Sequence, residues 1–428
     1  MTKLQHLIDT LCPHGVPFKP LAEIGTFIRG NGLQKKDFTD SGVGCIHYGQ
    51  IYTHYGTFAS KTISFVSEET ANNCRKAMPG DLVIAATSEN VDDVCKCVAW
   101  LGDEEVAISS DAFVFRHNLN PKYVAYYFQS DCFQKQKLPF VTGTKVMRVS
   151  SENLAKIIIP IPPMPVQEEI VRILDRFADY SAQLQAELQA RKAQYEFYRN
   201  HLLAFNAAAD GCGLEQKNIV TTPPTATYEI KWKTMGEIGT FIRGNGLQKK
   251  DFTESGVGCI HYGQIYTHYG TFASKTISFV SEDLAKNLLK VDCGDIVLAC
   301  TSENIDDVAK AVAWLGDEQI VTGGHSVVFK HKENPKYIAY FMQTASFFNQ
   351  KKKYAYGAKV IDIKTDDLAK IIIPIPPIPV QEKIVAILDR FEALVNDLCC
   401  GLPAEIDAAR ARYEFYRNHL LSFTPLSL

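Results

Sequence analysis

The sequence GTFIRGNGLQKKDFTDSGVGCIHYGQIYTHYGTFASKTISFVSE occupies Gly25–Glu68 and returns at Gly239–Glu282 with a single change, Asp40 to Glu254. The two copies start 214 residues apart. Solenoid repeats are only about 20 to 50 residues long, so this period is that of a whole domain. The chain is therefore expected to consist of two copies of one module.

Composition places the chain among ordinary globular proteins. Hydrophobic residues make up 46% and charged residues 22%, and the formal charge of −3 gives no overall basic field. Binding to nucleic acid would therefore depend on local basic patches. No apolar run approaches the roughly 18 to 20 residues that span a bilayer, and the first residues lack a signal-peptide pattern. We expect a cytoplasmic protein with no membrane association.

The cysteines do not indicate a disulfide framework or a zinc site. Of the 12 cysteines, only one position recurs between the copies, and two histidines recur beside it. These residues are Cys45, His47 and His54 in the first copy and Cys259, His261 and His268 in the second. A structural zinc site needs four ligands, so we expect free thiols in a reducing compartment and no bound metal.

Each copy combines a β-rich module with a long helix. Short segments rich in β-branched and aromatic residues alternate with glycine and proline turns, which is typical of a mainly-β fold. One helix is expected within the first module, at Pro121–Phe133. After the proline-rich segment 157–165, apolar residues recur every three or four positions from Val166 to Phe205, which predicts a coiled-coil helix about 60 Å long.

The second helical region contains four more residues than the first. They lie near Gly401 and Pro403, and proline inside a helix costs about 3 kcal/mol, so a break or kink is expected there. The predicted fold is α+β, with two mainly-β modules related by a pseudo-two-fold axis and separated by two long antiparallel coiled-coil helices. The expected segments are a lead-in (1–20), the first module (21–163), the first helix (164–206), a connector (207–234), the second module (235–377), and the second helix with the C-terminus (378–428).

Such a doubled arrangement suits duplex DNA, whose strands are themselves related by two-fold axes. A scaffold that holds two peptide-binding modules apart would use the same geometry. The sequence favours DNA binding, because it resembles a known family of DNA-binding proteins. The order of module, IIIPIPPxPVQExIVxILDRF, helix and YEFYRNHLL, given twice, resembles the specificity subunits of type I restriction-modification enzymes. Its most specific part is the helix start at Pro162–Glu168 and Pro376–Glu382.

The resemblance implies a set of roles and partners. Each module would be a target-recognition domain that reads one half of a bipartite double-stranded DNA target. The helices would set the spacer between the halves and dock two methyltransferase subunits and, through them, the restriction and translocase subunits. The chain itself would be non-catalytic and hold no cofactor, with S-adenosylmethionine, ATP and Mg²⁺ belonging to the partner subunits.

Motifs for independent catalysis are missing from the sequence. There is no phosphate-binding loop, no Asn-Pro-Pro-Tyr methylation motif and no strand-linked Gly-x-Gly-x-x-Gly. The acidic groups at Asp92–Asp93 and Asp103–Glu105 allow a nuclease centre in principle, but solvated turn charges are the better interpretation. Catalysis is best assigned to partner subunits.

Contacts to DNA phosphates carry no sequence information, so both copies can share them. Basic residues that recur are the candidates, with plain solvated side chains as the alternative. They are Arg29, Lys35, Lys36, Lys61 and Lys145, repeated as Arg243, Lys249, Lys250, Lys275 and Lys359.

Contacts to bases must differ wherever the two half-sites differ, and the copies diverge in two loops. The candidates are Ser109, Ser110, Asp111, Phe140, Thr142, Thr144 and Arg148 in the first module, against Gly323, Gly324, His325, Tyr354, Tyr356, Ala358 and Asp362 in the second. The largest change is Arg148 to Asp362. Arginine binds two acceptors of guanine, whereas aspartate accepts, for example from cytosine. Drift on an exposed loop is the alternative.

Two shared polar segments remain open to two interpretations. They contain Tyr48, Gln50, Ser88 and Asn90 in the first module and Tyr262, Gln264, Ser302 and Asn304 in the second. They read a base common to both half-sites, or they are turns that determine the fold. Modules this similar predict half-sites that are related but not identical, and thus a nearly palindromic target.

Overall fold

The computed structural model describes residues 3–205, 230–396 and 401–426, which form two compact units. The first unit comprises residues 1–185 and 405–428, and the second comprises residues 186–404. Each unit therefore contains one β module together with parts of both helical regions. Most of the connector expected at 207–234 lies outside the described residues.

Two five-stranded sheets form the first module. One has the order β2 (Gly25–Arg29), β12 (Ala112–His117), β8 (Leu82–Ala85), β10 (Cys97–Trp100) and β5 (Phe58–Ala59). The other has the order β3 (Phe38–Thr39), β6 (Ser64–Val66), β4 (Val43–Ile46), β11 (Val106–Ile108) and β7 (Lys76–Ala77). The central strands β8 and β10 are buried along their whole length, as expected from their continuous apolar sequence.

Two short antiparallel pairs complete the first module. They are β1 (Phe18–Pro20) with β14 (Ile158–Pro160) and β9 (Thr87–Ser88) with β13 (Met147–Arg148). Short helices connect the strands, namely α2 (Leu21–Ile24), α3 (Tyr48–Thr53), α4 (Glu68–Asn72) and α7 (Ser151–Leu154). The pairing of β9 with β13 joins a shared turn to a loop that differs between the copies.

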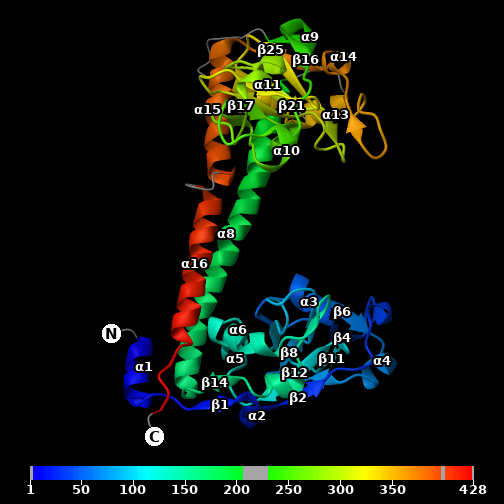
Figure 1. The fold of residues 1–428 in the computed structure, drawn as a ribbon. Coiled ribbons are helices and arrows are strands. Elements are labelled where there is room, and N and C mark those ends of the chain that lie inside the picture. Colours follow the sequence, from blue (N-terminus) through cyan, green and yellow to red (C-terminus); the bar gives the residue numbers. More distant parts are fainter. Residues whose placement is uncertain (1–2, 206–229, 397–400, 427–428) are drawn as a thin grey trace, which may run out of the picture. The chain divides into compact units, whose positions relative to one another are not determined.

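The single helix predicted at Pro121–Phe133 is wrong in its extent. The structure has α5 (Pro121–Phe128) and, after a two-residue break, α6 (Asp131–Lys137). Ser130 causes the break because its hydroxyl accepts a hydrogen bond from the Phe133 N–H at 3.3 Å and so caps a new helix. Figure 1 shows α5 and α6 between the long helix α8 and the strands of this module.

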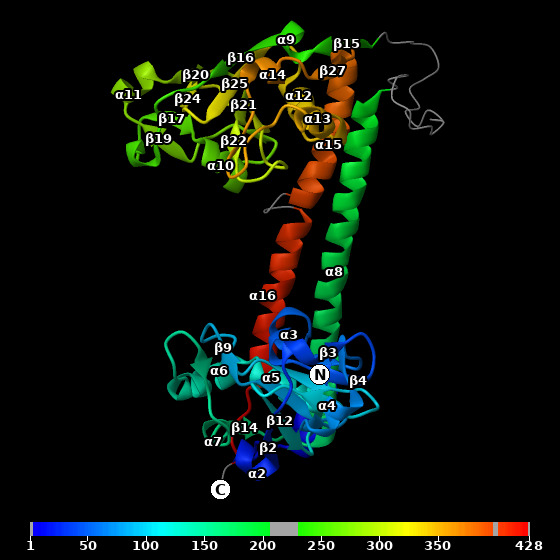
Figure 2. The ribbon, with the colours of Figure 1, turned by 90° about the vertical axis from the view of Figure 1, so that its right-hand side faces the viewer.

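The second module repeats this plan. Its five-stranded sheet has the order β16 (Gly239–Arg243), β25 (Ser326–His331), β21 (Ile296–Ala299), β23 (Lys310–Trp314) and β18 (Phe272–Ala273). Its four-stranded sheet has the order β19 (Ser278–Val280), β17 (Val257–Ile260), β24 (Ile320–Thr322) and β20 (Leu289–Val291). The short pairs are β15 (Lys231–Thr234) with β27 (Ile372–Ile375) and β22 (Thr301–Ser302) with β26 (Ile361–Asp362). The helices are α9 (Met235–Ile238), α10 (Tyr262–Thr267), α11 (Glu282–Asn287), α12 (Pro335–Phe341), α13 (Ala345–Lys351) and α14 (Thr365–Leu368). In Figure 2, α12 and α13 lie beside α15 and next to the strands.

The long helices agree with the predicted pattern. Helix α8 (Met164–Ala204) is continuous over 41 residues. The second region contains α15 (Ile378–Asn396) and α16 (Leu402–Leu420), and residues 397–400 lie outside the described ranges. Gly401 is a bend and Pro403 stands in the first turn of α16, which agrees with the break predicted near these two residues. A short helix, α1 (Lys3–Leu11), begins the described chain. No helix in the described ranges is long and apolar enough to cross a membrane.

The helices pair in antiparallel fashion within the first unit. Phe177 of α8 stacks on Tyr416 of α16 with ring centroids 5.0 Å apart. Further along α8, the Tyr180 hydroxyl donates to Glu405 at 2.6 Å, at the start of α16. Because the partner positions descend as α8 ascends, the two helices run in opposite directions, and the predicted fold class is confirmed.

Polar residues that recur at both helix starts hold each module to its own helix. Gln167 accepts from the Asn120 N–H at 3.0 Å and donates to the Pro162 carbonyl at 2.8 Å. Asp175 binds Lys122 at 2.8 Å and accepts from the Tyr126 hydroxyl at 2.7 Å. The second unit repeats these contacts with the residues Gln381, Asn334, Pro376, Asp389, Lys336 and Tyr340. The motif that carries the family resemblance is thus a joint between module and helix.

The two YEFYRNHLL segments make the reverse connection. The copy in α8, which follows the first module in sequence, packs on the second module, where Arg199 donates to Gln343 at 3.0 Å. The copy in α16, which follows the second module, packs on the first, where Tyr413 donates to Gln129 at 3.1 Å. Each module is therefore held by the helix of its own repeat and by the closing segment of the other.

Candidate nucleic-acid interface

Four predicted DNA-contact residues of the first module line one cavity of about 410 Å³. They are Arg29, Asp111, Thr142 and Arg148. Other lining residues include Thr87, Phe113 and Glu152. Residues 29, 111 and 148 are far apart in sequence, so the fold has brought a shared arginine together with both loops that differ between the copies.

The cavity is built by backbone pairing. Arg29 ends β2 opposite Phe113 of β12. Arg148 lies on β13 opposite Thr87 of β9, and it exchanges two backbone hydrogen bonds with Thr142, at 2.9 and 2.8 Å. The intervening turn requires Gly143, which has φ +107° and where a Cβ would lie 2.0 Å from the Val146 carbonyl oxygen. The backbone of the turn therefore fixes the position of residue 148. The side chain of residue 148 makes none of the backbone hydrogen bonds that form the turn.

Electrostatically, the first-module cavity presents two unpaired arginines. Within the part of the chain that the structure describes, neither Arg29 nor Arg148 forms an ion pair, and Asp111 forms none either. Glu152, the other acidic residue of the lining, lies in the first turn of α7, where backbone and serine hydrogen bonds lower its pKa. Both guanidinium groups are exposed and keep their N–H donors available to a ligand.

The second module differs at the corresponding place. Arg243 donates to Asp362 at 3.0 Å, and this hydrogen bond raises the pKa of the arginine. The backbone is the same as in the first module, because Asp362 lies opposite Thr301 and exchanges two backbone hydrogen bonds with Tyr356, at 3.0 and 2.9 Å. The other carboxylate oxygen, Oδ1 of Asp362, is buried and has no hydrogen-bond partner among the described residues.

Two of the shared candidates have their polar atoms occupied within the protein. Gln50 accepts from the His47 N–H at 2.9 Å and donates to the Ser64 hydroxyl at 2.6 Å. Gln264 makes the same two contacts in the second module, at 3.0 and 2.6 Å. Both glutamines cap a short helix. Their neighbours Tyr48 and Tyr262 are half-buried at the start of that helix.

The shared Thr-Ser-Glu-Asn segment forms a hydrogen-bonded turn. Asn90 accepts from the Asp93 N–H and donates to the Asp93 carboxylate, both at 2.8 Å, while Ser88 accepts from the Asn90 N–H at 3.3 Å. Ser302 and Asn304 repeat the arrangement. These contacts favour the interpretation of the segment as a turn that determines the fold.

Sequence reasoning missed the residues that hold this turn. The Tyr52 hydroxyl donates to the Thr87 carbonyl at 2.5 Å, and Tyr266 does the same to Thr301 at 2.7 Å. The buried Lys137 of α6 also holds the turn, because it donates to the carbonyls of Val91, Asp92 and Val94 at 2.9 to 3.1 Å. Its equivalent Lys351 donates to those of Asp306 and Val308 at 2.7 and 2.6 Å. The available signal was their recurrence at the same offset of 214 residues.

The loop at positions 109–111 and 323–325 serves partly to support the fold. Ser109 is buried, and its hydroxyl accepts from the Tyr48 N–H at 2.8 Å. In the second module Gly323 takes this place, because a Cβ there would lie 2.4 Å from the Cβ of Leu247. His325 packs against Tyr262 with ring centroids 5.0 Å apart. Ser110 and Gly324 are half-buried beside these residues.

The remaining candidates are exposed and do not line the cavity. They are Lys35, Lys36, Lys61, Thr144 and Lys145 in the first module and Lys249, Lys250, Lys275, Tyr356 and Lys359 in the second. Tyr354 is half-buried, and the Nζ of Lys370 lies 5.7 Å from the centroid of the Tyr354 ring. The basic residues therefore surround the modules as separate surface charges.

The recurrent cysteine and histidine have internal roles. Cys45 and Cys259 are buried, and burial raises the pKa of each thiol to about 12. His47 accepts from the Gly49 N–H at 3.1 Å and caps α3. In the described ranges every cysteine is a free thiol, and no group of three or more His, Cys, Asp or Glu residues is placed to hold a metal ion.

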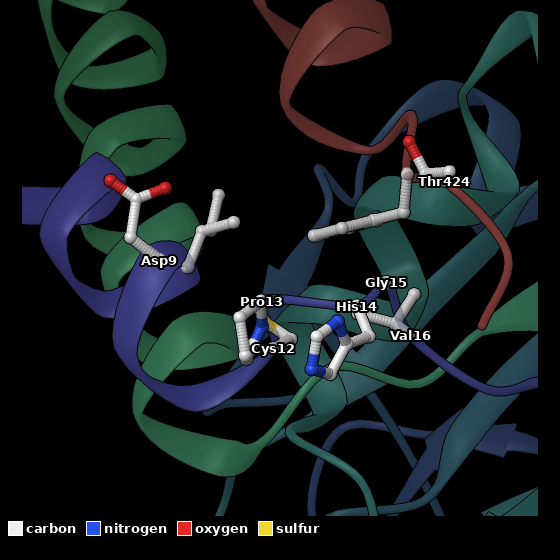
Figure 3. Close-up of a pocket in the computed structure, with 9 residues that line it drawn as sticks. Asp9, Cys12, Pro13, His14, Gly15, Val16 and Thr424 are labelled. Atoms are coloured by element: carbon white, nitrogen blue, oxygen red, sulfur yellow. The ribbon is translucent and has the colours of Figure 1, made fainter. Parts of the chain in front are cut away.

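A second cavity, of about 540 Å³, lies away from these residues in the first unit. Figure 3 shows Asp9 on α1 and Thr424 of the C-terminal segment on opposite sides of it. Cys12, His14 and Phe423 also line it. None of the predicted DNA-contact residues does.

The fold and the candidate site define a duplicated protein of two homologous β modules, with a polar cavity in the first and an arginine–aspartate pair at the corresponding place of the second. The sequence matches the family described as Type I restriction modification DNA specificity domain over residues 13–191 and 229–408. The chain belongs to this family.

Individual relatives agree with the family match. The chain is 30% identical over 289 residues to the specificity subunit of the type I restriction enzyme EcoR124I/EcoR124II of Escherichia coli, covering 64% of this chain and 65% of that subunit. It is 28% identical over 324 residues to the putative type I restriction enzyme specificity subunit S.HindORF215P of Haemophilus influenzae, covering 72% and 74%. A solved chain from work on complex assembly and conformational transition of a type I restriction-modification system shares the fold, with a TM-score of 0.58, 16% identity, and coverage of 95% and 97%.

Proposed function

We propose that this chain is the DNA-specificity subunit of a type I restriction-modification enzyme, and that each module reads one half of a bipartite double-stranded target. One observation carries the proposal: the same backbone frame occurs twice, with the residue at one position of its short ladder changed from Arg148 to Asp362. A repeated frame with a variable lining suits the reading of two related but different half-sites. The exposed lysines around each module would contact phosphates.

The helices would set the spacer and dock two methyltransferase subunits. Phe197 on α8 is 60% exposed and stacks on His201, and Phe415 on α16 is 64% exposed and stacks on His419. Both pairs belong to the YEFYRNHLL segments, whose other residues hold the modules. Exposed aromatic side chains at equivalent points fit two copies of one partner. These subunits, and restriction subunits bound through them, would supply S-adenosylmethionine, ATP and Mg²⁺ chemistry, and this chain would be non-catalytic.

The test is to map methylated adenines genome-wide in cells with and without this gene. We expect a set of bipartite sites, two short half-sites separated by a fixed spacer, that loses methylation when the gene is deleted. Unchanged methylation would overturn the proposal. The purified chain alone, incubated with duplex DNA, Mg²⁺ and S-adenosylmethionine, is expected to yield neither methylated nor cleaved product.

The docking surface is tested separately by co-purification. Phe197→Ala with Phe415→Ala is expected to release both methyltransferase subunits, and either change alone is expected to release one. Leu11→Ala, an exposed apolar residue on α1, is the matched control and should retain both. Full retention by the double variant would place the docking surface elsewhere.

A further inference from the structure

We propose that positions 148 and 362 give the two clefts opposite hydrogen-bonding character, so that the first module reads a base edge that offers acceptors and the second reads a base edge that offers a donor. The inference rests on the proposed function, because it assumes that both clefts face DNA. It goes further by naming the residue pair and the chemical class of base at one position of each half-site.

The shared arginine is the fixed part of both clefts. Arg29 and Arg243 end equivalent strands, β2 and β16, and are paired with Phe113 and Val327 of the neighbouring strands. The residue that lines the same cavity as this arginine in the first module, and binds it in the second, is the variable part. It is held on the same two-strand ladder in both modules, so the backbone position is the same whether the residue is Arg148 or Asp362.

In the first module the variable residue adds a second donor group. A guanidinium carries five N–H donors and no acceptor, and neither Arg29 nor Arg148 forms an ion pair with any described residue. Glu152 does not distinguish the modules, since Asp366 occupies the equivalent position. A cleft with two free guanidinium groups fits the O6 and N7 acceptors of guanine. A phosphate would offer acceptors of the same kind.

In the second module the variable residue reverses this character. Asp362 binds the shared arginine through Oδ2 at 3.0 Å and so removes part of its donor capacity. Its Oδ1 is buried without a partner, and leaving a buried acceptor unsatisfied is costly. An amino group of cytosine or adenine, N4 or N6, would supply the missing donor. Asp362 therefore masks an arginine and at the same time holds an acceptor that has no partner among the described residues.

Two further differences between the modules involve charged residues. Ser150, which lines the cavity of the first module, is replaced by Lys364, whose Nζ lies 5.6 Å from the ring centroid of Tyr356. Asp111 of the first module, which lines the cavity, is replaced by His325, which packs on Tyr262 in the second. Asp111 forms no ion pair with Arg29 or Arg148 within the described residues. It therefore leaves both guanidinium groups available, unlike Asp362.

The experiment uses the complex of this chain with its methyltransferase subunits and sequences the methylated sites. Arg148→Asp is expected to change one base of one half-site, from guanine to cytosine or adenine, by about ten- to hundred-fold in preference. Asp362→Arg is expected to change one base of the other half-site to guanine. Arg148→Ala is the control that should lose discrimination at its position without gaining a new preference. Thermal unfolding of each variant checks that the fold is kept.

Three outcomes would overturn the inference. Unchanged half-sites in both charge-reversal variants would show that the clefts do not read bases. A uniform loss of methylation at all sites in Arg148→Asp, with a weaker salt dependence of DNA binding, would show that the arginine contacts phosphate. A change in the same half-site for both variants would show that the two modules do not each read their own half-site. In each case, mapping the methylated sites of the unaltered complex still tests the proposed function independently, because that test asks only whether the target is bipartite.

Discussion

The side-chain oxygen of Asn200 accepts a hydrogen bond from the backbone N–H of Ala345 at 2.7 Å. Asn418 accepts one from the Asp131 N–H at 2.9 Å in the first unit. Ala345 and Asp131 are the first residues of α13 and α6, where backbone N–H groups have no partner inside the helix. The asparagines of the two YEFYRNHLL segments therefore complete the start of a helix in the module of the other repeat.

Replacing these asparagines should loosen each module separately. We expect Asn200→Ala to reduce the free energy of unfolding by about 0.5 to 1.5 kcal/mol, because an exposed N–H at a helix start exchanges a protein partner for water. Hydrogen exchange should become faster at the start of α13 and stay unchanged at α6. Asn418→Ala is the matched variant with the opposite pattern. Equal effects on both helices from either variant would contradict a local role.

The buried Lys351 should make stability depend on pH in the alkaline range. Burial lowers its pKa from the usual 10.5 to about 8. Between these values the unfolded chain binds more protons than the folded one, so the contribution of Lys351 to stability is smallest below pH 8 and rises as the pH increases towards 10.5.

The measurement is urea unfolding of the protein and of Lys351→Met at pH 7.5, 8.5 and 9.5. The difference in the free energy of unfolding, protein minus variant, should increase with pH. Taking this difference removes the contributions of tyrosines and thiols, which titrate in the same range. A difference that is constant or falls with pH would contradict the assignment.

The exposed lysines should contribute to the salt dependence of DNA binding. Each phosphate contact contributes about 0.9 to the slope of log K against log salt concentration. Replacing Lys35, Lys36 and Lys61 by alanine is expected to lower that slope by about 2 to 3 and to leave the preferred sequence unchanged. Lys192→Ala, an exposed lysine of α8, is the control. An altered sequence preference would assign these lysines to base contacts instead.

Lengthening the helices should lengthen the spacer of the target. A four-residue insertion after Gln185 in α8, matched by one after Ala404 in α16, adds about one helical turn, or 6 Å. Base pairs are stacked about 3.4 Å apart, so we expect a spacer longer by one or two base pairs in the methylated sites. The same insertion in the connector 207–234 should leave the spacer unchanged. An unchanged spacer with lengthened helices would end the idea that they act as a ruler.

The duplication could be predicted because Gly25–Glu68 recurs almost unchanged at Gly239–Glu282. Apolar residues recur with the same spacing in both modules and at helical spacing after them, so the strands and the long helix could be predicted. The interruption was predicted from the four extra residues near Gly401 and Pro403. The break between α5 and α6 was missed, although Ser130 followed by Asp131 is a recognisable helix start. Apolar residues continue on both sides of it, and this periodicity concealed the cap.

The site was harder to predict, because sequence does not show which polar atoms are already satisfied. Gln50 and Asn90 are polar, shared and near loops, yet each is occupied by two contacts within its module. Comparison of the copies did identify Arg148 and Asp362. It could not show that the shared arginine faces them, because that proximity depends on the pairing of β9 with β13.

The crossed attachment of the YEFYRNHLL segments presents the same closing residues to both modules. Tyr195, Arg199 and Asn200 are identical to Tyr413, Arg417 and Asn418, and the surfaces that receive them also match at Gln129 and Gln343. A module moved from one position to the other would meet the same tyrosine, arginine and asparagine of the closing segment. It would not meet the same long helix, because Glu392 of α15, which accepts from Tyr195 and Thr271, is replaced by Ala178 in α8. The closing segments are therefore common to both positions, whereas Glu392 ties the second module to the helix of its own repeat.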